Sequence, residues 1–466
     1  MSVSNPGLRI PTRRNTELVL LIFAVLLVVA AEAAVEAARD GKLSSRLLTY
    51  ATVPLVVGLV THLVIRRFAR YADPLMLPIV VLLNGLGLVM IHRLDLGAKL
   101  QADQSGQSFT GAQAPTQVLW TAIGVGLFIG LIVLIRDHRS LQRYAYTLAL
   151  IGLFFLMLPA VLPARFSEVN GARIWIRLAG FSIQPGEFAK ILLTIFGAAY
   201  LVQKRDVLAL AGRRFLGIDF PRGRDFGPLL LAWLLCIGVL VRGHDLGTSL
   251  LFFGIFVVLL YVATERASWV IVGGVLFAGG AYVAYQLFGT VQTRVGVWLH
   301  PFSHVYEVAG TSYQLQQSLF GLGTGGIFGT GLGNGHPELV PLPATDFIIS
   351  SFGEETGLFG LVGLLALYAV LVTRGFAAGL AVRDAFGKLL ATGLAFLFAL
   401  QLFVVVAGVT RLLPETGLTT PFLSYGGSSL LGSWAILALL VRVSDSARRP
   451  ATTTPSRPAE NLAVSS

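Results

Sequence analysis

The chain has few charged residues and almost no cysteine. Only 13% of its 466 residues are charged, whereas 55% are hydrophobic. A water-soluble domain of this length could not bury so much apolar side chain. The single cysteine, Cys236, excludes a disulfide framework and is expected to act as a small apolar filler. We therefore expect the lipid bilayer to be the solvent for most of the chain.

Two common functional signatures are also missing. The tract 322–335 contains seven glycines, but no Gly-Lys-Ser/Thr follows it, so it is not a P-loop. The formal net charge is +11, yet the Lys and Arg residues lie in short segments between apolar runs rather than in a patch with aromatic residues. Nucleic acid is therefore not expected as a partner.

Long apolar runs take the place of these signatures. A helix needs about 20 mostly apolar residues to cross the hydrocarbon core, and only helices or closed barrels satisfy the backbone there. The runs are too long and continuous for barrel strands. The sequence predicts an all-α polytopic membrane protein with twelve transmembrane helices, centred in 17–38, 47–65, 74–92, 117–135, 143–162, 184–203, 228–242, 247–264, 268–287, 357–373, 389–409 and 422–442.

The basic residues predict the orientation of these spans. Lys and Arg are concentrated before the first span, in every second connection after it, and after the last span. Cytoplasmic segments carry this excess, so both termini are predicted to be cytoplasmic in a multi-pass protein of the cytoplasmic membrane. An Ala-rich stretch at 30–38 resembles a signal-peptide cleavage site, but an uncleaved span keeps the charge pattern consistent.

The organisation predicted along the chain is simple. Residues 1–16 form a cytoplasmic tail, 17–445 form one membrane domain, and 446–466 form a disordered cytoplasmic tail rich in Thr, Ser, Pro and Ala. Three outer segments interrupt the pattern of short connections, at 163–183, 288–356 and 410–421. The large segment 288–356, between the ninth and tenth helices, is Gly-rich and too apolar to be disordered, so function is expected there.

The first charged motif begins the sixth span. Glu187 and Lys190 are spaced i, i+3 and can pair on one helix face. Charges in the first turns of a span more often serve a polar cavity than a purely structural bridge, although both interpretations stay open. Asp245 precedes the eighth span, where it could line the cavity or cap the helix. Asp346 is expected to be a helix cap or dipole partner, and at least one of Glu354 and Glu355 to face the cavity.

Several outer motifs occur in a recognisable order. They are Asn170-Gly171-Ala172-Arg173-Ile174-Trp175-Ile176-Arg177, Gln184-Pro185-Gly186-Glu187, Arg294 to Gln314, Thr345-Asp346-Phe347, Gly353-Glu354-Glu355 and Ser424-Tyr425-Gly426-Gly427-Ser428. Over residues 74–445 the chain thereby resembles the SEDS family (shape, elongation, division and sporulation), which contains RodA, FtsW and SpoVE. The two spans within 17–70 exceed the family's usual ten and are similar to an extension found in actinobacterial RodA proteins.

The resemblance implies a peptidoglycan glycosyltransferase of the cell wall. Such an enzyme polymerises lipid II, an undecaprenyl diphosphate-linked disaccharide peptide, at the outer membrane face in elongation or division, with a class B penicillin-binding protein as partner. It needs a general base for the acceptor hydroxyl and cations for the departing diphosphate. The residues expected to bind substrate are Arg173, Trp175, Arg177, Glu187, Lys190, Arg294 and Arg411. A divalent cation could take the place of some of these cationic groups, and the resemblance indicates no other cofactor.

The chain departs from the family pattern at the base. The family places an Asp three residues after the proline that corresponds to Pro301, and here that position is His304. Either His304, whose imidazole titrates near neutral pH, or Glu307 could serve as the base. Two further interpretations stay open: a lipid II flippase, and a non-catalytic scaffold of the elongation or division machinery. A flippase should place charges at mid-membrane depth, whereas these lie at one face.

Overall fold

The structure is a bundle of long helices, described by a computed structural model for residues 12–41, 46–109, 111–169, 172–178, 181–209, 213–215, 218–220, 245–304 and 312–450, together with 227, 230–231, 233–235 and 238. The long helices are α1 (Arg14–Asp40), α2 (Arg46–Phe68), α3 (Met76–Gln104), α4 (Ala114–Leu134), α6 (Ala145–Val161), α8 (Gly186–Ala209), α10 (Leu246–Thr264), α11 (Ser268–Leu287), α15 (Ile348–Ala381), α16 (Ala385–Val409) and α17 (Gly427–Arg448).

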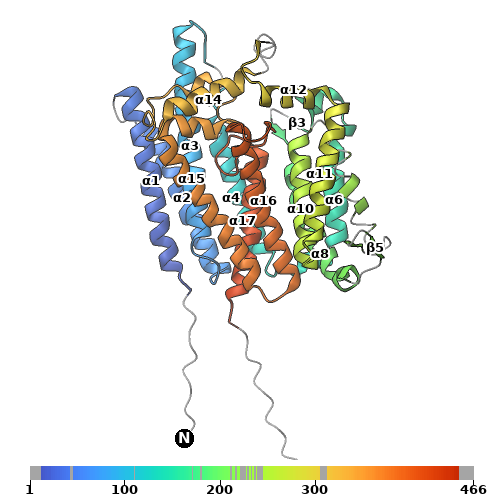
Figure 1. Cartoon of the computed structure of the whole chain (residues 1–466). Coiled ribbons are helices and arrows are strands. Elements are labelled where there is room, and N and C mark those ends of the chain that lie inside the picture. Colours follow the sequence, from blue (N-terminus) through green and yellow to red (C-terminus); the bar gives the residue numbers. More distant parts are fainter. Residues whose placement is uncertain are drawn as a thin grey trace, which may run out of the picture.

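Short elements connect the long helices, mostly at the outer face. They are α5 (Ser140–Arg143), α7 (Ala164–Ser167), α12 (Gly289–Leu299), α14 (Tyr313–Gly325) and the 3₁₀ turn η1 (Pro337–Leu339). Three antiparallel hairpins pair β1 (Glu168–Val169) with β2 (Ala172–Arg173), β3 (Ile176–Leu178) with β4 (Phe181–Ile183), and β5 (Arg213–Phe215) with β6 (Ile218–Phe220). In Figure 1, α12 and α14 lie across the outer end of the bundle.

Within the described residues, ten helices are long and apolar enough to cross a membrane. Each coincides with one of the predicted spans. The predicted span 143–162 corresponds to α6, which has 17 residues, and the predicted span 228–242 lies largely outside the described residues. The chain is therefore a multi-pass membrane protein, as expected, and the count of twelve stays a prediction. The first residues of α1 and the last of α17 lie at the same face (Figure 1), as the predicted orientation requires.

Two helix boundaries differ from those predicted. Helix α3 continues to Gln104, because its outer part is charged and therefore ends the apolar run without ending the helix. Helix α15 begins at Ile348, inside the outer segment predicted to extend to 356. It is kinked at Gly357, where φ is 67° and ψ is −172°, a conformation open to glycine. The large outer segment therefore ends in a short helical piece, 348–356.

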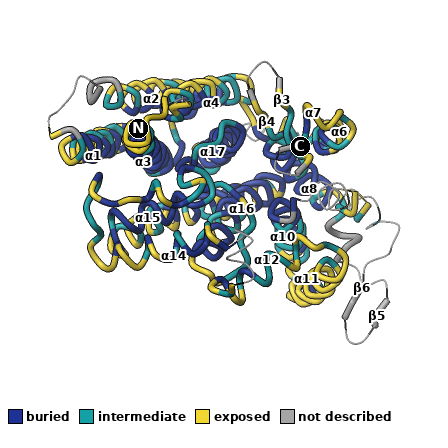
Figure 2. The backbone as a smooth tube through the Cα atoms, turned by 90° about the horizontal axis from the view of Figure 1, so that it is seen from above, coloured by how far each residue is buried: buried dark blue, intermediate teal, exposed yellow. Residues whose placement is uncertain are grey.

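The core lies around α17, which packs against α4, α8, α15 and α16. Seen from above in Figure 2, this helix is buried dark blue at the centre while α11 is exposed at the edge. Trp434 is completely buried, and Phe128 and Phe422 meet its ring edge-on. At the inner face, Asp73 pairs with Arg374 and Arg448. These contacts fix the ends of α15 and α17 and thereby hold the outer ends that carry the site.

Candidate functional site

The predicted pair on α8 is formed. The Lys190 Nζ lies 2.6 Å from Glu187 Oε2, and the two side chains are only 2% and 5% exposed. The i, i+3 spacing aligns them because α8 starts at Gly186, directly after Pro185. A buried ion pair loses much of its Coulombic gain to desolvation, so it is weak evidence for a purely stabilising role.

The pair continues into a polar chain across the bundle. Lys190 Nζ donates to Gln401 Oε1 of α16 at 2.9 Å, and Gln401 Nε2 donates to the Thr419 carbonyl at 2.8 Å. The Thr419 hydroxyl in turn donates to Ser429 Oγ of α17 at 2.8 Å. These contacts join α8, α16, the last outer segment and α17 at their outer ends. Each polar group has a partner, so the chain is pre-organised.

Asp245 both caps a helix and belongs to this polar region. Its Oδ1 accepts from the Thr248 amide at 2.9 Å, which is an N-cap of α10. Its Oδ2 accepts from Gln184 Nε2 at 3.3 Å, and the Gln184 amide donates to Ser428 Oγ at 2.8 Å. Burial raises the pKa of Asp245, which the capping bonds from Thr248 partly offset. The capping and cavity interpretations are therefore compatible.

Helix α12 lies over this region and is held at its C-terminal end by Arg411. The guanidinium donates from Nε to the Trp298 carbonyl at 2.9 Å and from Nη2 to the Leu299 carbonyl at 2.8 Å. The Trp298 indole donates back to the Arg411 carbonyl at 3.1 Å. A cation at a helix C-terminus is favourable because the last carbonyls carry partial negative charge. Arg411, expected to bind substrate, thus also fixes α12 on the last outer segment.

Arg294 of α12 lies among acids from three other segments. Burial raises the pKa of Asp245, Asp346 and Glu415, and the charge of Arg294 offsets part of this rise in each. Burial and the neighbouring Glu415 nevertheless raise the pKa of Asp346 to about 7. Burial likewise raises the pKa of Glu415. A cation and two carboxyl groups that titrate above their usual range therefore share the space between α12, α15 and residues 410–426.

The expected cap by Asp346 is not present. The N-cap residue of α15 is Phe347, and no side chain caps this helix end. The last outer segment comes close to Asp346 at Gly417, whose φ is +69°. A Cβ on Gly417 would lie 3.9 Å from Asp346 Oδ2. Asp346 is instead placed beside Glu415 and Arg294, because residues 343–346 turn toward the last outer segment. The Ser424 hydroxyl donates to the Thr345 carbonyl at 2.7 Å.

Glu354 and Glu355 are engaged under the glycine-rich tract rather than facing Lys190. Glu355 forms a buried ion pair with Arg93 of α3 and accepts from the Gly333 amide at 3.0 Å. Glu354 accepts from the His336 amide at 2.6 Å. The expectation that at least one of them faces the cavity stays a prediction; the counter-charge that Glu355 meets is Arg93, from a helix distant in sequence. Both have structural contacts.

The predicted residues of the first outer segment lie on the hairpins. Arg173 and Arg177 are exposed; the first pairs with Glu168 at 3.1 Å, and the second donates to the Glu168 carbonyl at 3.1 Å. The Trp175 amide donates to the Ser167 carbonyl at 3.4 Å. Arg173 also lines a small cavity with Gln184 and Asp245. This cavity links the hairpins to the polar region.

Of the two predicted bases, the structure describes His304. His304 is exposed and follows α12 and the turn at Pro301 and Phe302. Glu307 lies outside the described residues. The turn is fixed by Gln316 of α14, whose Nε2 donates to the Pro301 carbonyl at 2.7 Å. The backbone three residues before His304 is therefore held in place at the outer surface.

Sequence reasoning missed two members of the site. Gln401 lies in an apolar run, and a lone amide inside a span was a usable signal for a buried hydrogen bond. Glu415 follows a proline in a short polar stretch, and nothing local distinguishes it from a surface acid. In the part of the chain that the structure describes, no group of three or more His, Cys, Asp or Glu side chains could hold a metal ion.

The chain is similar to proteins of one family along most of its length. A family model described as a cell cycle protein family, FtsW/RodA/SpoVE, matches residues 73–449. Proteins named peptidoglycan glycosyltransferase RodA are similar to the chain: that of Mycobacterium tuberculosis is 54% identical and covers 96% of this chain and 93% of its own. That of Mycobacterium leprae is 53% identical and covers 95% and 92%.

Solved structures agree with the fold. One chain, from a structure described as structural coordination of polymerization and crosslinking by a peptidoglycan synthase complex, is 28% identical with a TM-score of 0.61 and covers 81% of this chain and 99% of its own. The rod shape determining protein RodA of Thermus thermophilus is 25% identical with a TM-score of 0.53 and covers 81% and 98%.

Proposed function

The chain belongs to the FtsW/RodA/SpoVE family of cell cycle proteins, and we propose that it is a peptidoglycan glycosyltransferase that polymerises lipid II at the outer face of the cytoplasmic membrane. Its partner would be a class B penicillin-binding protein transpeptidase, in cell elongation and shape or in division. The similarity to a chain of a peptidoglycan synthase complex supports a partner of this kind.

One observation carries the proposal: a polar region at the outer end of an otherwise apolar bundle, with the buried pair Glu187 and Lys190 below and Arg294 of α12 above. Charge in a membrane helix is costly and is usually retained for function. A negatively charged headgroup at this depth would meet cations on two sides. An apolar lipid tail would meet the bundle beneath.

The chemistry of glycosyl transfer assigns roles to these residues. The acceptor sugar hydroxyl loses a proton to a base while the donor's anomeric C–O bond to the diphosphate breaks. Inversion at the anomeric carbon takes place in one displacement, and no covalent enzyme intermediate is needed. The leaving diphosphate gains negative charge, which Arg294 and Lys190 would stabilise. Arg173, Trp175, Arg177 and Arg411 would contact the headgroup from the hairpins and the last outer segment.

Three residues are candidates for the general base. His304 and Glu307 are the candidates from the sequence, and Asp346 joins them because of its position beside Arg294. A base that titrates close to the working pH is the most effective, and Asp346 has a pKa of about 7. Its ionised form would accept the acceptor's proton. The neighbouring Glu415 would disfavour that ionised form before the reaction, which makes Asp346 a stronger base.

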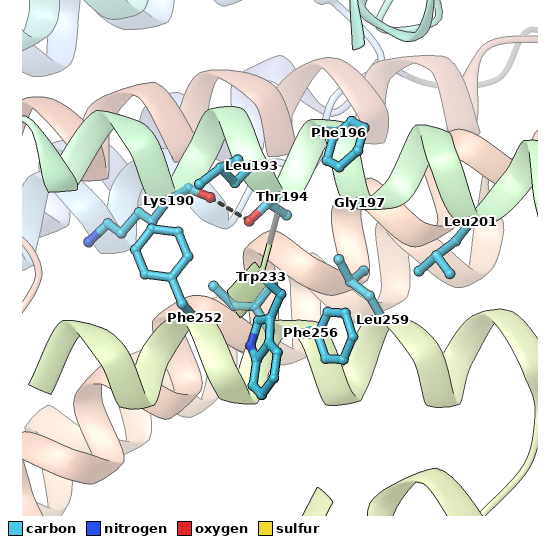
Figure 3. Close-up of a pocket in the computed structure, with 11 residues that line it drawn as sticks. Lys190, Leu193, Thr194, Phe196, Gly197, Leu201, Trp233, Phe252, Phe256 and Leu259 are labelled. Carbon is cyan, nitrogen blue, oxygen red and sulfur yellow. Dashed lines mark hydrogen bonds between the residues drawn. The ribbon is translucent and has the colours of Figure 1, made fainter. Parts of the chain in front are cut away.

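An apolar groove beside Lys190 suits the lipid tail. It is lined by residues of α8 and α10 and by Trp233. Figure 3 shows it running along α8 from Lys190 past Gly197 to Leu201. At 1.5 Å rise per residue, the eleven steps from Lys190 to Leu201 span about 16 Å. A tail in this groove would hold its diphosphate near Lys190.

The test uses the purified full-length chain, its class B penicillin-binding protein and labelled lipid II in liposomes. Glycan strands would establish the polymerase. Lipid II that crosses the bilayer without forming strands would overturn the proposal in favour of a flippase. Partner binding with neither strands nor translocation would overturn it in favour of a scaffold. The rivals are less favoured because the described acids and bases around Arg294 lie at one face.

A further inference from the structure

The two-helix N-terminal extension contacts the glycine-rich outer tract directly. Arg39, in the last turn of α1, donates from Nη2 to the Gly335 carbonyl at 2.8 Å. The same nitrogen lies 3.7 Å from Glu338 Oε1. Both side chains are nearly buried, at 13% and 12% exposure, so solvent screens the contact only in part. The extension therefore reaches the outer segment that carries part of the site.

Apolar packing makes the contact close. Leu332 packs against the cluster formed by Val28, Ala31 and Val35 of α1 with Val89 of α3. Gly333 has φ +88°, and a Cβ there would lie 2.8 Å from the Ala38 Cβ. Only glycine allows this backbone conformation and this distance together. The tract is thus shaped to receive the outer end of α1.

A second cation lies under the same carbonyl group. Arg93 of α3 also donates to the Gly335 carbonyl, and its Nη1 lies 2.6 Å from Glu338 Oε2. It pairs with Glu355 as well. Burial of Glu338 opposes its ionisation, but the charge of Arg93 and the hydrogen bonds from the backbone, His336 and Arg93 together outweigh burial and lower the pKa of Glu338. Arg39 and Arg93 therefore share one carbonyl and one carboxylate, and together they fix residues 335–338.

This fixed tract holds the first piece of α15. The Thr330 and Gly331 amides donate to the Glu354 and Glu355 carbonyls at 3.0 and 2.9 Å. The Gly333 and His336 amides donate to the side chains of the same two residues. The helical piece 348–356 ends at the kink and begins two residues after Asp346. At 1.5 Å per residue it is about 13 Å long, short enough to transmit a shift from one end to the other.

We propose that Arg39 is a positioning residue, through which the N-terminal extension braces the tract 330–338 and so sets the position of Asp346 beside Arg294. The inference rests on the proposed function for its catalytic consequence. The brace itself is a structural statement about this chain. It gives the extension a role in the reaction that acts through the tract 330–338.

The test compares Arg39→Met, which keeps most of the aliphatic stem, with Arg39→Lys and with Arg66→Met. Arg66 is exposed at the inner end of α2, so its replacement removes one charge from the extension far from the tract. All three are made in the full-length protein. Lipid II polymerisation gives kcat and KM. Hydrogen exchange followed by mass spectrometry reports the amides of residues 330–338 and needs no activity.

Arg39→Met should speed exchange of these amides about fivefold, the effect of one lost hydrogen bond. It should lower kcat about tenfold or more with KM for lipid II within twofold, because a displaced reacting group costs rate rather than binding. Arg39→Lys should recover part of both effects, and Arg66→Met should show neither. Unchanged exchange in Arg39→Met overturns the brace. Faster exchange with unchanged kcat overturns its catalytic role. If the wild type makes no glycan, the proposed function fails, while the exchange result still judges the brace.

Discussion

Replacing Asp346 with Asn tests the identity of the base most sharply. If the ionised Asp346 accepts the acceptor's proton, the rate must rise with pH and level off above its pKa of about 7. A group with that pKa is about 9% ionised at pH 6 and about 91% ionised at pH 8, so the rate should rise about tenfold between them. Asp346→Asn should abolish most activity and this rise together.

The assay follows polymerisation of labelled lipid II by the purified protein with its partner at half-unit steps from pH 5 to 9. His304→Gln and Glu307→Gln are the matched variants. If Asp346 is the base, both variants should keep the rise between pH 6 and 8. Loss of the rise in His304→Gln and its persistence in Asp346→Asn would refute the assignment to Asp346.

A stability measurement separates this effect from unfolding. Because the folded protein raises the pKa of Asp346 from 3.8 to about 7, the folded state keeps its proton to higher pH than the unfolded state does. The free energy of unfolding should therefore decrease as pH rises between about 4 and 7. Asp346→Asn should remove this part of the decrease, measured as the Tm difference between pH 5 and 8. An unchanged difference would contradict the burial argument.

The other predictions concern the kink, the groove and the buried pair. Gly357→Ala should lower Tm clearly, because a Cβ there would lie 2.3 Å from the Gly329 nitrogen at a positive φ. The control Gly363→Ala should leave Tm unchanged, because no atom lies within 4 Å of a Cβ at that position. Equal Tm values for the two variants would contradict the strained kink at Gly357. Gly197→Phe should fill the groove and raise KM for lipid II with its full tail but not for a short-tailed analogue. An equal rise in KM for both substrates would exclude the groove as the tail site. Lys190→Met should destabilise the protein by about 3 kcal/mol by leaving Glu187 buried without its partner. The double variant with Glu187→Gln should regain stability but not activity, and a double variant that polymerises normally would show the pair to be structural.

Much of the fold was predictable from local sequence. The apolar runs predicted each of the ten described helices that can cross a membrane, because a backbone in lipid must satisfy its hydrogen bonds within the span. The pairing of Glu187 with Lys190 was also predictable, since helix geometry alone brings i and i+3 together. The N-cap by Asp245 follows from the same local geometry. The outer motifs further indicated the family.

Other features depended on contacts that no local pattern contains. Asp346 was expected to be a helix cap or dipole partner, but no side chain caps α15, and Asp346 interacts electrostatically with Glu415, 69 residues away in sequence, and with Arg294. The ion pair of Glu355 with Arg93, at a sequence separation of 262, was not predicted at all. Such contacts are decided by which helix ends meet, and this in turn depends on packing of the whole bundle.

The scarcity of charge and the long apolar runs therefore determined, by themselves, that this is a multi-pass membrane protein. The tertiary structure alone decided which charged residues meet there. It gathered Arg294, Asp346 and Glu415 from three separate segments and set Arg39 of the extension against Gly335. The physical reason is that the transfer of a side chain into lipid depends on that residue's own hydropathy, which the sequence gives directly. The electrostatic interaction between two charges depends on the distance between them in space, which only the fold determines.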